Sequence, residues 1–237
     1  MNIGLQLYSV RSFMNADEKD TLKQVADMGY NVVEIAGLPK ASAEEFKAWC
    51  DELGLKVNSA HVGMALLEDD KYEDTIKYLK TIGCTRYIVP GGMPYATKED
   101  MDYATAWFNK YQPILEKEGM ELMFHNHNGE FLPNQDGQIP HVELQKRTNI
   151  KFQIDVYWSY RGGVNPMYVL EQLKDRIDVI HLKDGNMQGG SPLGMGEVDI
   201  KGIYAWAEKN GIDMIVENEP VAEVEMSEAK ICIDFLK

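Results

Sequence analysis

Cysteine, positive charge and long apolar runs are all scarce in this chain of 237 residues. Its three cysteines, Cys50, Cys84 and Cys232, form no CxxC pair, which argues against a disulfide framework and against a thiolate zinc site. With 24 Lys and Arg against 38 Asp and Glu, the net charge of −14 leaves no basic surplus for nucleic acid. No window approaches the roughly 18 apolar residues of a membrane span, and no leader pattern opens the chain. We therefore expect a globular, cytoplasmic protein with no nucleic-acid or membrane partner.

Short apolar runs rich in Val, Ile, Tyr and Phe alternate with longer amphipathic stretches along the whole chain. The expected strands are 3–8, 31–36, 56–60, 86–89, 120–125, 151–156, 179–182 and 213–217. The expected helices are 18–28, 43–53, 72–82, 98–118, 142–147, 166–173, 200–209 and 224–235. Gly29, Gly54 and Gly211 directly follow helices, where a left-handed residue is needed to end a helix and turn the chain.

The alternation of strand and helix predicts a parallel sheet joined by crossover helices. Two architectures fit this pattern: a closed (β/α)8 TIM barrel, or an open doubly wound sheet with extra strands. We favour the barrel because the number of strand–helix units reaches eight and because polar residues gather at one end of the strands. No composition break, linker or internal repeat divides the chain, so residues 1–237 are expected to form a single domain.

Polar side chains collect where the expected strands end, which is where the loops of a parallel α/β fold converge on a site. Four of the five histidines fall at these ends. The strand-end residues that we single out are Glu34, His61, His125, His127, Asp155, His181, Lys183, Glu217 and Glu219. Because alternate residues of a strand share a face, His125 faces the same side as His127, and His181 the same side as Lys183.

Four of these side chains, His125, Asp155, His181 and Glu217, come from four consecutive strands and can converge on one point. A single strand-end His or Asp is more often a cap or a satisfied interior group, but four on successive strands favour a metal site. Mixed nitrogen and oxygen donors without thiolate suit Mn, Zn, Co, Ni or Mg. The sequence therefore predicts one divalent metal ion at the ends of these strands.

The remaining strand-end residues allow two interpretations each. Lys183 is either part of a solvated loop or a substrate-binding group, and Glu34 and Glu219 are either ion-paired inside the barrel mouth or substrate-binding. Trp158, which follows Asp155 at a strand end, is either a core or rim residue or the wall against which a sugar ring packs. The chain has neither GxxxxGK[ST] nor a GxGxxG after a strand, so nucleotide binding has no support.

Seven segments of the chain are similar to one known family. They are GLQLYSVR at 4–11, VVEIAG at 32–37, HNHNGEF at 125–131, FQIDVYW at 152–158, VIHLKD at 179–184, LGMGEVDI at 193–200 and IVENE at 215–219. With these motifs the whole chain resembles the sugar phosphate isomerase/epimerase family of xylose isomerase-like TIM barrels, which includes inosose dehydratases, inosose isomerases and ketose 3-epimerases. The motifs specify the family more closely than they specify a substrate.

The resemblance implies a divalent metal held by Glu, Asp, His and Glu from strands five to eight. Asp155, His181 and Glu217 match the last three of these ligands. The first departs from the family pattern, because this chain has His125-Asn126-His127 in place of a strand-five Glu and carries its carboxylate later, at Glu130. Either His125 is the ligand or Glu130 folds back to replace it, and strand geometry favours His125.

Such a metal, with manganese the favoured ion, implies chemistry through an enediolate of a small sugar or keto-sugar. Reprotonation at the same carbon epimerises, reprotonation at the neighbouring carbon isomerises, and loss of a β-substituent eliminates. The expected acid and base groups are Glu217, Glu130 and His127. Lys183 and His61 are expected to bind or polarise substrate oxygens.

We therefore expect a metal-dependent sugar isomerase or epimerase. With His125 in place of a carboxylate, a lyase acting on a keto-inositol or a 3-keto-glycoside is a close alternative. A hydrolase of abasic DNA, as in endonuclease IV of the same barrel type, is disfavoured by the net charge and by only five histidines. A non-catalytic sugar-binding barrel is the fourth reading. A homodimer could supply a wall that the tight loops leave open.

Overall fold

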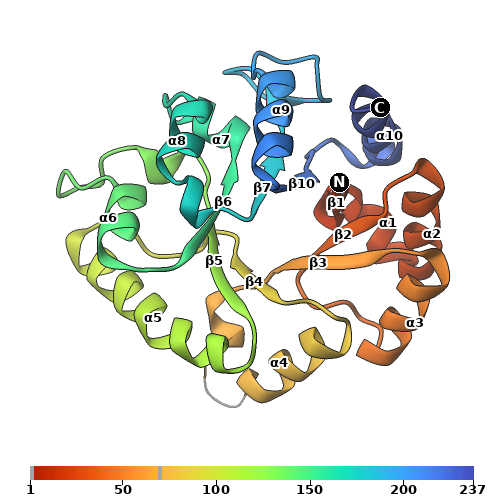
Figure 1. The fold of residues 1–237 in the computed structure, drawn as a ribbon, viewed down its shortest axis with the longest axis horizontal. Helices are drawn as coiled ribbons and strands as arrows, with labels where there is room; N and C mark the ends of the chain where they lie inside the picture. The colour runs from red at the N-terminus through yellow and green to blue at the C-terminus, as the bar shows by residue number, and fades with distance from the viewer. Residues whose placement is uncertain (1–2, 69–70) are drawn as a thin grey trace.

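The computed structural model describes residues 3–68 and 71–237. Eight parallel strands close into a barrel in the order β1-β10-β7-β6-β5-β4-β3-β2, with helices around it (Figure 1). The barrel strands are β1 (Ile3–Gln6), β2 (Val32–Ala36), β3 (Lys56–His61), β4 (Arg86–Val89), β5 (Glu121–His125), β6 (Lys151–Asp155), β7 (Val179–Leu182) and β10 (Asp213–Val216). The prediction of a (β/α)8 TIM barrel is therefore confirmed.

The helices follow the amphipathic stretches of the sequence. They are α1 (Arg11–Ala16), α2 (Glu18–Met28), α3 (Ala43–Leu53), α4 (Tyr72–Thr81), α5 (Lys98–Lys117), α6 (Pro140–Arg147), α7 (Val156–Arg161), α8 (Pro166–Gln172), α9 (Ile200–Asn210) and α10 (Glu225–Phe235). Ser42 and Thr97 begin α3 and α5 as capping boxes. The hydroxyl of each accepts a hydrogen bond from a backbone N–H of the first turn, and an acidic side chain of that turn accepts one from the backbone N–H of Ser42 or Thr97. Gly29 and Gly211 end α2 and α9 with φ values of 102° and 69°.

Three segments differ from the sequence-based expectation. The first strand was expected to reach Tyr8 but ends at Gln6, because the Gln6 side chain accepts a hydrogen bond from the Tyr8 N–H and starts a 3₁₀ turn, η1 (Leu7–Val10), that leads into α1. The sixth strand ends at Asp155, whose carboxylate caps α7. The segment after β7 contains a short antiparallel hairpin, β8 (Asp184–Gly185) and β9 (Gly190–Ser191), which the sequence did not predict.

The interior of the barrel changes from apolar to polar along the strands. One layer is a buried apolar cluster of Val32, Ile88, Met123, Val179 and Ile215. Two residues further along four of these strands, on the same face, the side chains are Glu34, His125, His181 and Glu217. All four are at most 6% exposed. The polar layer lies between this apolar layer and the loops that follow the strands.

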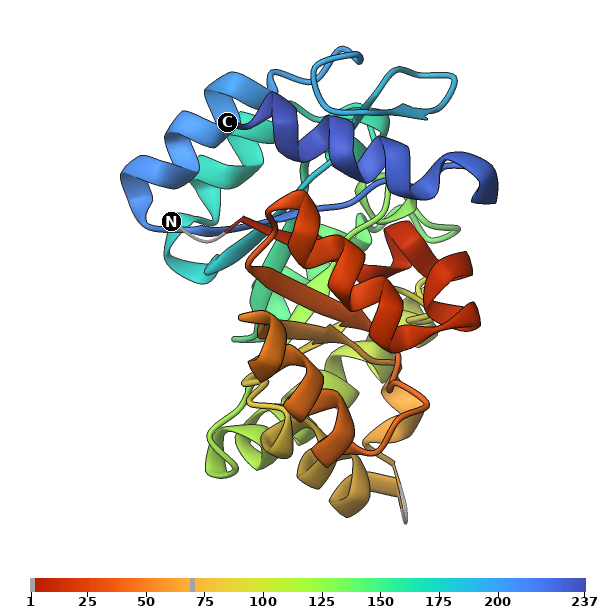
Figure 2. The same cartoon turned by 90° about the vertical axis from the view of Figure 1, so that its right-hand side faces the viewer.

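The two ends of the described chain meet and complete the ring of helices. Helix α10 lies beside the first helices of the chain (Figure 2). There the Tyr30 hydroxyl donates to the carbonyl oxygen of Ala229 at 2.8 Å, and Lys237 Nζ donates to that of Met28 at 3.2 Å.

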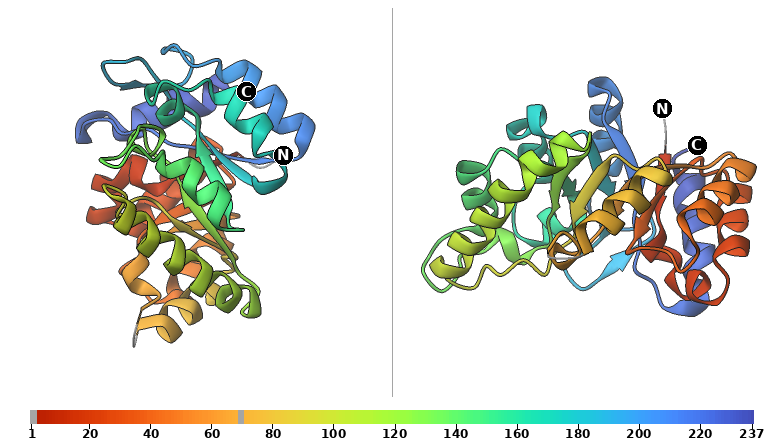
Figure 3. Two further views of the ribbon diagram at one scale, coloured as in Figure 1. Left: turned by 90° about the vertical axis from the view of Figure 1, so that its left-hand side faces the viewer. Right: turned by 90° about the horizontal axis from the view of Figure 1, so that it is seen from below.

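The segment between β7 and α9 projects as a long loop beside α9 (Figure 3). Within the described ranges, no helix has the length and apolar content needed to cross a membrane.

Candidate metal centre

Four buried side chains from neighbouring strands converge at the polar end of the barrel. His125 comes from β5, Asp155 from β6, His181 from β7 and Glu217 from the residue after β10, and these strands are adjacent in the barrel. One ligand atom from each residue lies within 4.8 Å of the others. The structure thus brings together all four residues that the sequence predicts as metal ligands.

One carboxylate oxygen of Asp155 is held by a hydrogen bond, and the other has no partner. Its Oδ1 accepts a hydrogen bond from the Trp158 N–H at 2.8 Å, while Oδ2 is buried and has no hydrogen-bond partner. The Asn126 side chain fixes the backbone of Asp155 with two further bonds, at 3.1 and 3.2 Å. Burial raises the pKa of Asp155 to about 7 in spite of the nearby Lys183 ammonium. An unpartnered buried carboxylate oxygen among three other ligand groups fits a divalent cation.

His181 lies between two carboxylates. Its Nδ1 is 2.8 Å from Glu217 Oε2 and 3.8 Å from Asp155 Oδ2, and its Nε2 is 2.6 Å from Glu34 Oε1. Burial lowers the pKa of His181, but Glu34 and Glu217 outweigh it and raise the pKa to about 10. The ring is therefore an imidazolium in this metal-free arrangement, and its Nδ1 proton lies where the four ligand groups meet.

Glu34 lies beneath these ligands and is closed off from the cavity. It is completely buried, and its carboxylate accepts hydrogen bonds from Gln6, Ser59, Gln153 and His181. Burial raises its pKa, but His61 and His181 lower the pKa well below its usual range. The expectation that Glu34 contacts substrate is therefore not supported, because all of its contacts are to the interior of the barrel.

Above the ligands lies a cavity of about 370 Å³. Its walls include His61, His125, His127, Glu217 and Glu219, so five of the residues expected at the site do face it. Burial lowers the pKa of His127, so its ring is neutral at neutral pH.

Lys183 and Trp158 stand together at one side of the ligands. Lys183 is 1% exposed, pairs with Glu219, and lies 3.9 Å from Glu217 Oε2. Its Nζ is 4.6 Å from the centre of the Trp158 ring, and the His127 ring centre lies 5.5 Å from that of Trp158. Burial lowers the pKa of Lys183, but Glu217 and Asp155 raise it above its ordinary value, so the side chain stays an ammonium.

Glu130 lies apart from the four candidate ligands. It is the middle residue of the 3₁₀ turn Gly129–Phe131 after β5, is 2% exposed, and its Oε2 accepts a hydrogen bond from the His127 N–H at 3.0 Å. Burial raises its pKa. The carboxylate holds the turn that carries His127 and does not line the cavity over the ligands, so the geometry supports neither an acid/base role nor a ligand role for Glu130.

Sequence reasoning missed three polar residues of this site: Gln6, Ser59 and Gln153. All three are buried and hydrogen-bond to Glu34. The available signal was an uncharged polar residue inside an otherwise apolar strand, two positions before a functional residue, as Gln153 stands before Asp155.

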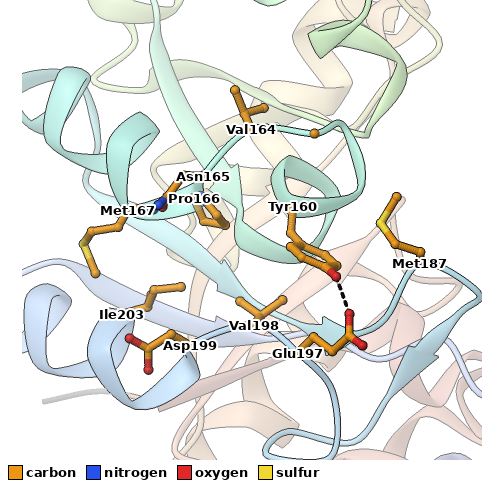
Figure 4. Close-up of a pocket in the computed structure, with 11 residues that line it drawn as sticks. Tyr160, Val164, Asn165, Pro166, Met167, Met187, Glu197, Val198, Asp199 and Ile203 are labelled. Atoms are coloured by element: carbon orange, nitrogen blue, oxygen red, sulfur yellow. Dashed lines mark hydrogen bonds between the residues drawn. The ribbon is translucent and has the colours of Figure 1, made fainter.

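A second cavity, of about 600 Å³, lies between the α7–α8 loop and the start of α9, where the Tyr160 hydroxyl bonds Glu197 (Figure 4). It shares no lining residue with the cavity over the ligands.

Comparison with known proteins agrees with the fold. A sugar phosphate isomerase/epimerase from Parabacteroides distasonis superposes with a TM-score of 0.85 at 27% identity, over 99% of this chain and 97% of that one. A D-allulose 3-epimerase from Methylomonas sp. superposes with a TM-score of 0.68 at 14% identity, over 100% and 96% of the two chains, which shows the fold alone.

An inosose dehydratase from Geobacillus kaustophilus is 22% identical over 190 residues, 70% of this chain and 62% of that protein. The chain thus matches about three fifths of the length of that curated relative. The family model described as "Xylose isomerase-like TIM barrel" matches residues 22–236, nearly the whole chain. The resemblance found in the sequence is confirmed, and the chain belongs to the xylose isomerase-like TIM barrel family.

Proposed function

We propose that this protein is a divalent-metal-dependent isomerase or epimerase of a small sugar or keto-sugar. The observation that carries the proposal is the buried Oδ2 atom of Asp155, which has no partner although it lies beside His181 and Glu217. A buried carboxylate oxygen without a hydrogen bond costs stability, and a cation at this point would satisfy it. The name of the similar Parabacteroides protein, sugar phosphate isomerase/epimerase, supports the same class of reaction.

His125, Asp155, His181 and Glu217 would hold the ion, with two nitrogen and two oxygen donors suited to Mn, Zn, Co, Ni or Mg. We favour manganese. When bound there, a divalent cation would supply positive charge against the negative charge that develops on a substrate oxygen during proton transfer.

Two bases face the cavity from different strands. Glu217, at the end of β10, stays ionised because Lys183 and His181 lower its pKa against the effect of burial. His127, beyond β5, is neutral because burial lowers its pKa, so its free ring nitrogen can accept a proton. One base removing a proton from carbon and another group returning it is what epimerisation and isomerisation require.

Other side chains in the cavity wall, or in contact with it, would bind and orient the substrate. Lys183 and Trp158 do not line the cavity themselves but contact Glu219 and His127, which do. Lys183 donates hydrogen bonds from a buried ammonium and would polarise a substrate oxygen. Trp158, beside Lys183 and His127, offers an apolar ring face suited to a sugar. His61 and Glu219 line the cavity and supply further polar contacts.

A lyase that dehydrates a keto-inositol is the second candidate. The similarity to an inosose dehydratase favours it. So does His125, because an imidazole here takes the strand-five position at which a carboxylate would serve as acid and base. The two candidates share the proton-abstraction step and differ in whether a hydroxyl group leaves afterwards.

The proposal is tested by elemental analysis followed by solvent exchange. We expect close to one equivalent of divalent metal in the parent and none in Asp155→Asn. Candidate keto-sugars are then incubated with the metal-loaded protein in deuterated water. Deuterium incorporation without loss of water identifies an isomerase or epimerase, whereas a dehydrated product identifies a lyase. His127→Gln is expected to keep the metal and lose the exchange. If the parent binds no divalent metal when supplied with one, the proposal is wrong.

A further inference from the structure

We infer that Glu34 and Gln153 are positioning residues that decide which ring nitrogen of His125 and of His181 remains available to a metal ion. The inference deepens the proposed function, since it assumes that these two histidines are ligands. It concerns side chains that touch neither the substrate cavity nor the centre of the ligand group. Its basis is the direction of each hydrogen bond in a completely buried network.

The network starts at Glu34, because an ionised carboxylate can only accept hydrogen bonds. Oε1 faces Gln6 Nε2 at 2.7 Å and His181 Nε2 at 2.6 Å. Oε2 faces Gln153 Nε2 at 2.7 Å and the Ser59 hydroxyl. Every neighbour of Glu34 in this set is therefore a donor, and the amide nitrogen of Gln153 must point at Glu34.

The orientation of the Gln153 amide then fixes the tautomer of His125. With its nitrogen committed to Glu34, Gln153 presents Oε1 to the other side, where His125 Nδ1 lies at 3.0 Å and His61 Nε2 at 2.6 Å. An amide oxygen can only accept, so both ring nitrogens carry a hydrogen. His125 is therefore held as the Nδ1–H tautomer, and the lone pair on its Nε2 is left free for the metal ion.

The Glu34 carboxylate also orients the His181 ring, but it holds Nε2 of that ring, whereas Gln153 holds Nδ1 of His125. His181 donates from Nε2 to Glu34, so Nδ1, the nitrogen near Glu217 and Asp155, is the one from which an ion would displace the proton. Each ligand histidine thus has its other nitrogen tied to the network. A neutral ring whose hydrogen sat on the nitrogen that faces the ion would have no lone pair there to bind it.

This network also explains a second group of close imidazoles, His61, His125 and His181. Spacing alone would allow these three rings to hold an ion of their own. However, the nitrogens that His61 and His181 turn toward this region already donate to Gln153 and Glu34. The group is accounted for as a hydrogen-bonded layer that supports the metal site.

The sharpest test removes the charge of Glu34 and observes His125, which Glu34 does not touch. In Glu34→Gln the amide of Gln153 is no longer obliged to donate toward residue 34, so it can turn and present its NH₂ group to His125. In Gln153→Met the acceptor for His125 is absent. Glu225→Gln is the matched control, because Glu225 is also completely buried but begins α10 and bonds Ser12 of α1, which is not part of this network.

Two readouts are compared on chelator-treated protein. Nitrogen-15 NMR of histidine-labelled protein reports which nitrogen of His125 carries the hydrogen, and Mn²⁺ titration followed by electron paramagnetic resonance reports affinity. We expect the Nδ1–H form in the parent and in Glu225→Gln. In Glu34→Gln and Gln153→Met we expect loss of that preference and Mn²⁺ binding weakened about 10–100-fold.

Several outcomes would overturn the inference. An Nε2–H tautomer of His125 in the parent overturns it, even if a variant fails to fold. So does a folded Glu34→Gln protein that keeps the Nδ1–H form, or that binds Mn²⁺ within twofold of the parent. A parent that binds no divalent metal defeats the proposed function instead, while the tautomer measurements on metal-free protein still decide whether Glu34 and Gln153 orient the rings.

Discussion

Replacement of Asp155 by Asn is expected to stabilise the metal-free protein while removing its metal site. Asp155 is completely buried, its Oδ2 atom has no partner, and burial raises the pKa of the carboxyl group from 3.8 to about 7. The unfolded chain ionises this group near its ordinary pKa, so the folded protein loses stability as the pH rises from about 4 to 7. At about 1.4 kcal/mol for each pKa unit, the buried carboxylate costs up to roughly 4 kcal/mol above pH 7.

The asparagine keeps an oxygen that can accept from the Trp158 N–H and is uncharged at every pH. Because it also removes a negative charge that favours the Lys183 ammonium, we expect a net gain of about 2–4 kcal/mol in unfolding free energy. Metal-free Asp155→Asn should therefore melt about 5–10 °C above the parent at pH 8, with little difference at pH 4. Metal at about 100 times its Kd should stabilise the parent by about 2.7 kcal/mol and leave the variant unchanged.

Scanning calorimetry of chelator-treated protein at pH 4, 6 and 8, with and without Mn²⁺, measures all of these effects. Asp184→Asn is the matched control, since Asp184 is 1% exposed but its two carboxylate oxygens accept from four backbone N–H groups in the loop before α9. That variant should melt lower than the parent and keep the metal response. A metal-free Asp155→Asn protein that melts below the parent at pH 8, or that still responds to metal, would refute the reasoning.

Three further predictions concern the strand-five ligand, the buried His141 and the loop after β7. His125→Ala should abolish metal uptake in elemental analysis while Glu130→Gln retains it, and the reverse result would make Glu130 the ligand. Burial lowers the pKa of His141 to about 3, so below pH 6.5 the unfolded chain binds a proton that the folded chain does not, and the parent loses stability. Between pH 7.5 and 5, urea titrations should show the unfolding free energy of the parent falling by about 2 kcal/mol more than that of His141→Phe. Equal losses in the two proteins would contradict this. Gly196→Ala would place its Cβ 2.6 Å from the Gly185 carbonyl oxygen, so Tm should fall, whereas an unchanged Tm would show that the loop can move aside.

The barrel could be predicted from the sequence because each strand–helix unit carries residues that mark where its helix begins and ends. The predicted helices 18–28 and 43–53 coincide with α2 and α3, where Asp17 and Ser42 cap the start and Gly29 and Gly54 end the helix. The short elements α7 and β8–β9 could not be read in this way. Helix α7 begins within what looks like a continuing strand, because the carboxylate of Asp155 supplies its cap, and the hairpin is held by long-range bonds to Asp184.

The convergence of the four candidate ligands was predictable because four ligand-type residues stand at the ends of four apolar strands. The roles of Glu34 and Glu130 were not, because a carboxylate at a strand end looks the same whether it faces the cavity or the interior. Glu34 turns inward, where Gln6, Ser59 and Gln153 supply donors from other strands. Only the closure of the barrel brings those side chains together, so no local pattern could assign them.

The charges at this end of the barrel explain why Asp155 is the residue left without a partner. Lys183 pairs with Glu219, and the His181 imidazolium is shared between Glu34 and Glu217. No cation in the described ranges forms an ion pair within 4 Å of Asp155 except His181, which lies 3.8 Å away and is already bonded to two other carboxylates. The four carboxylates exceed the two cations by two negative charges, and a divalent ion that displaces the Nδ1 proton of His181 would lower this excess to one. The instability of buried Asp155 in the metal-free chain and the proposed affinity for a divalent metal therefore have the same physical cause.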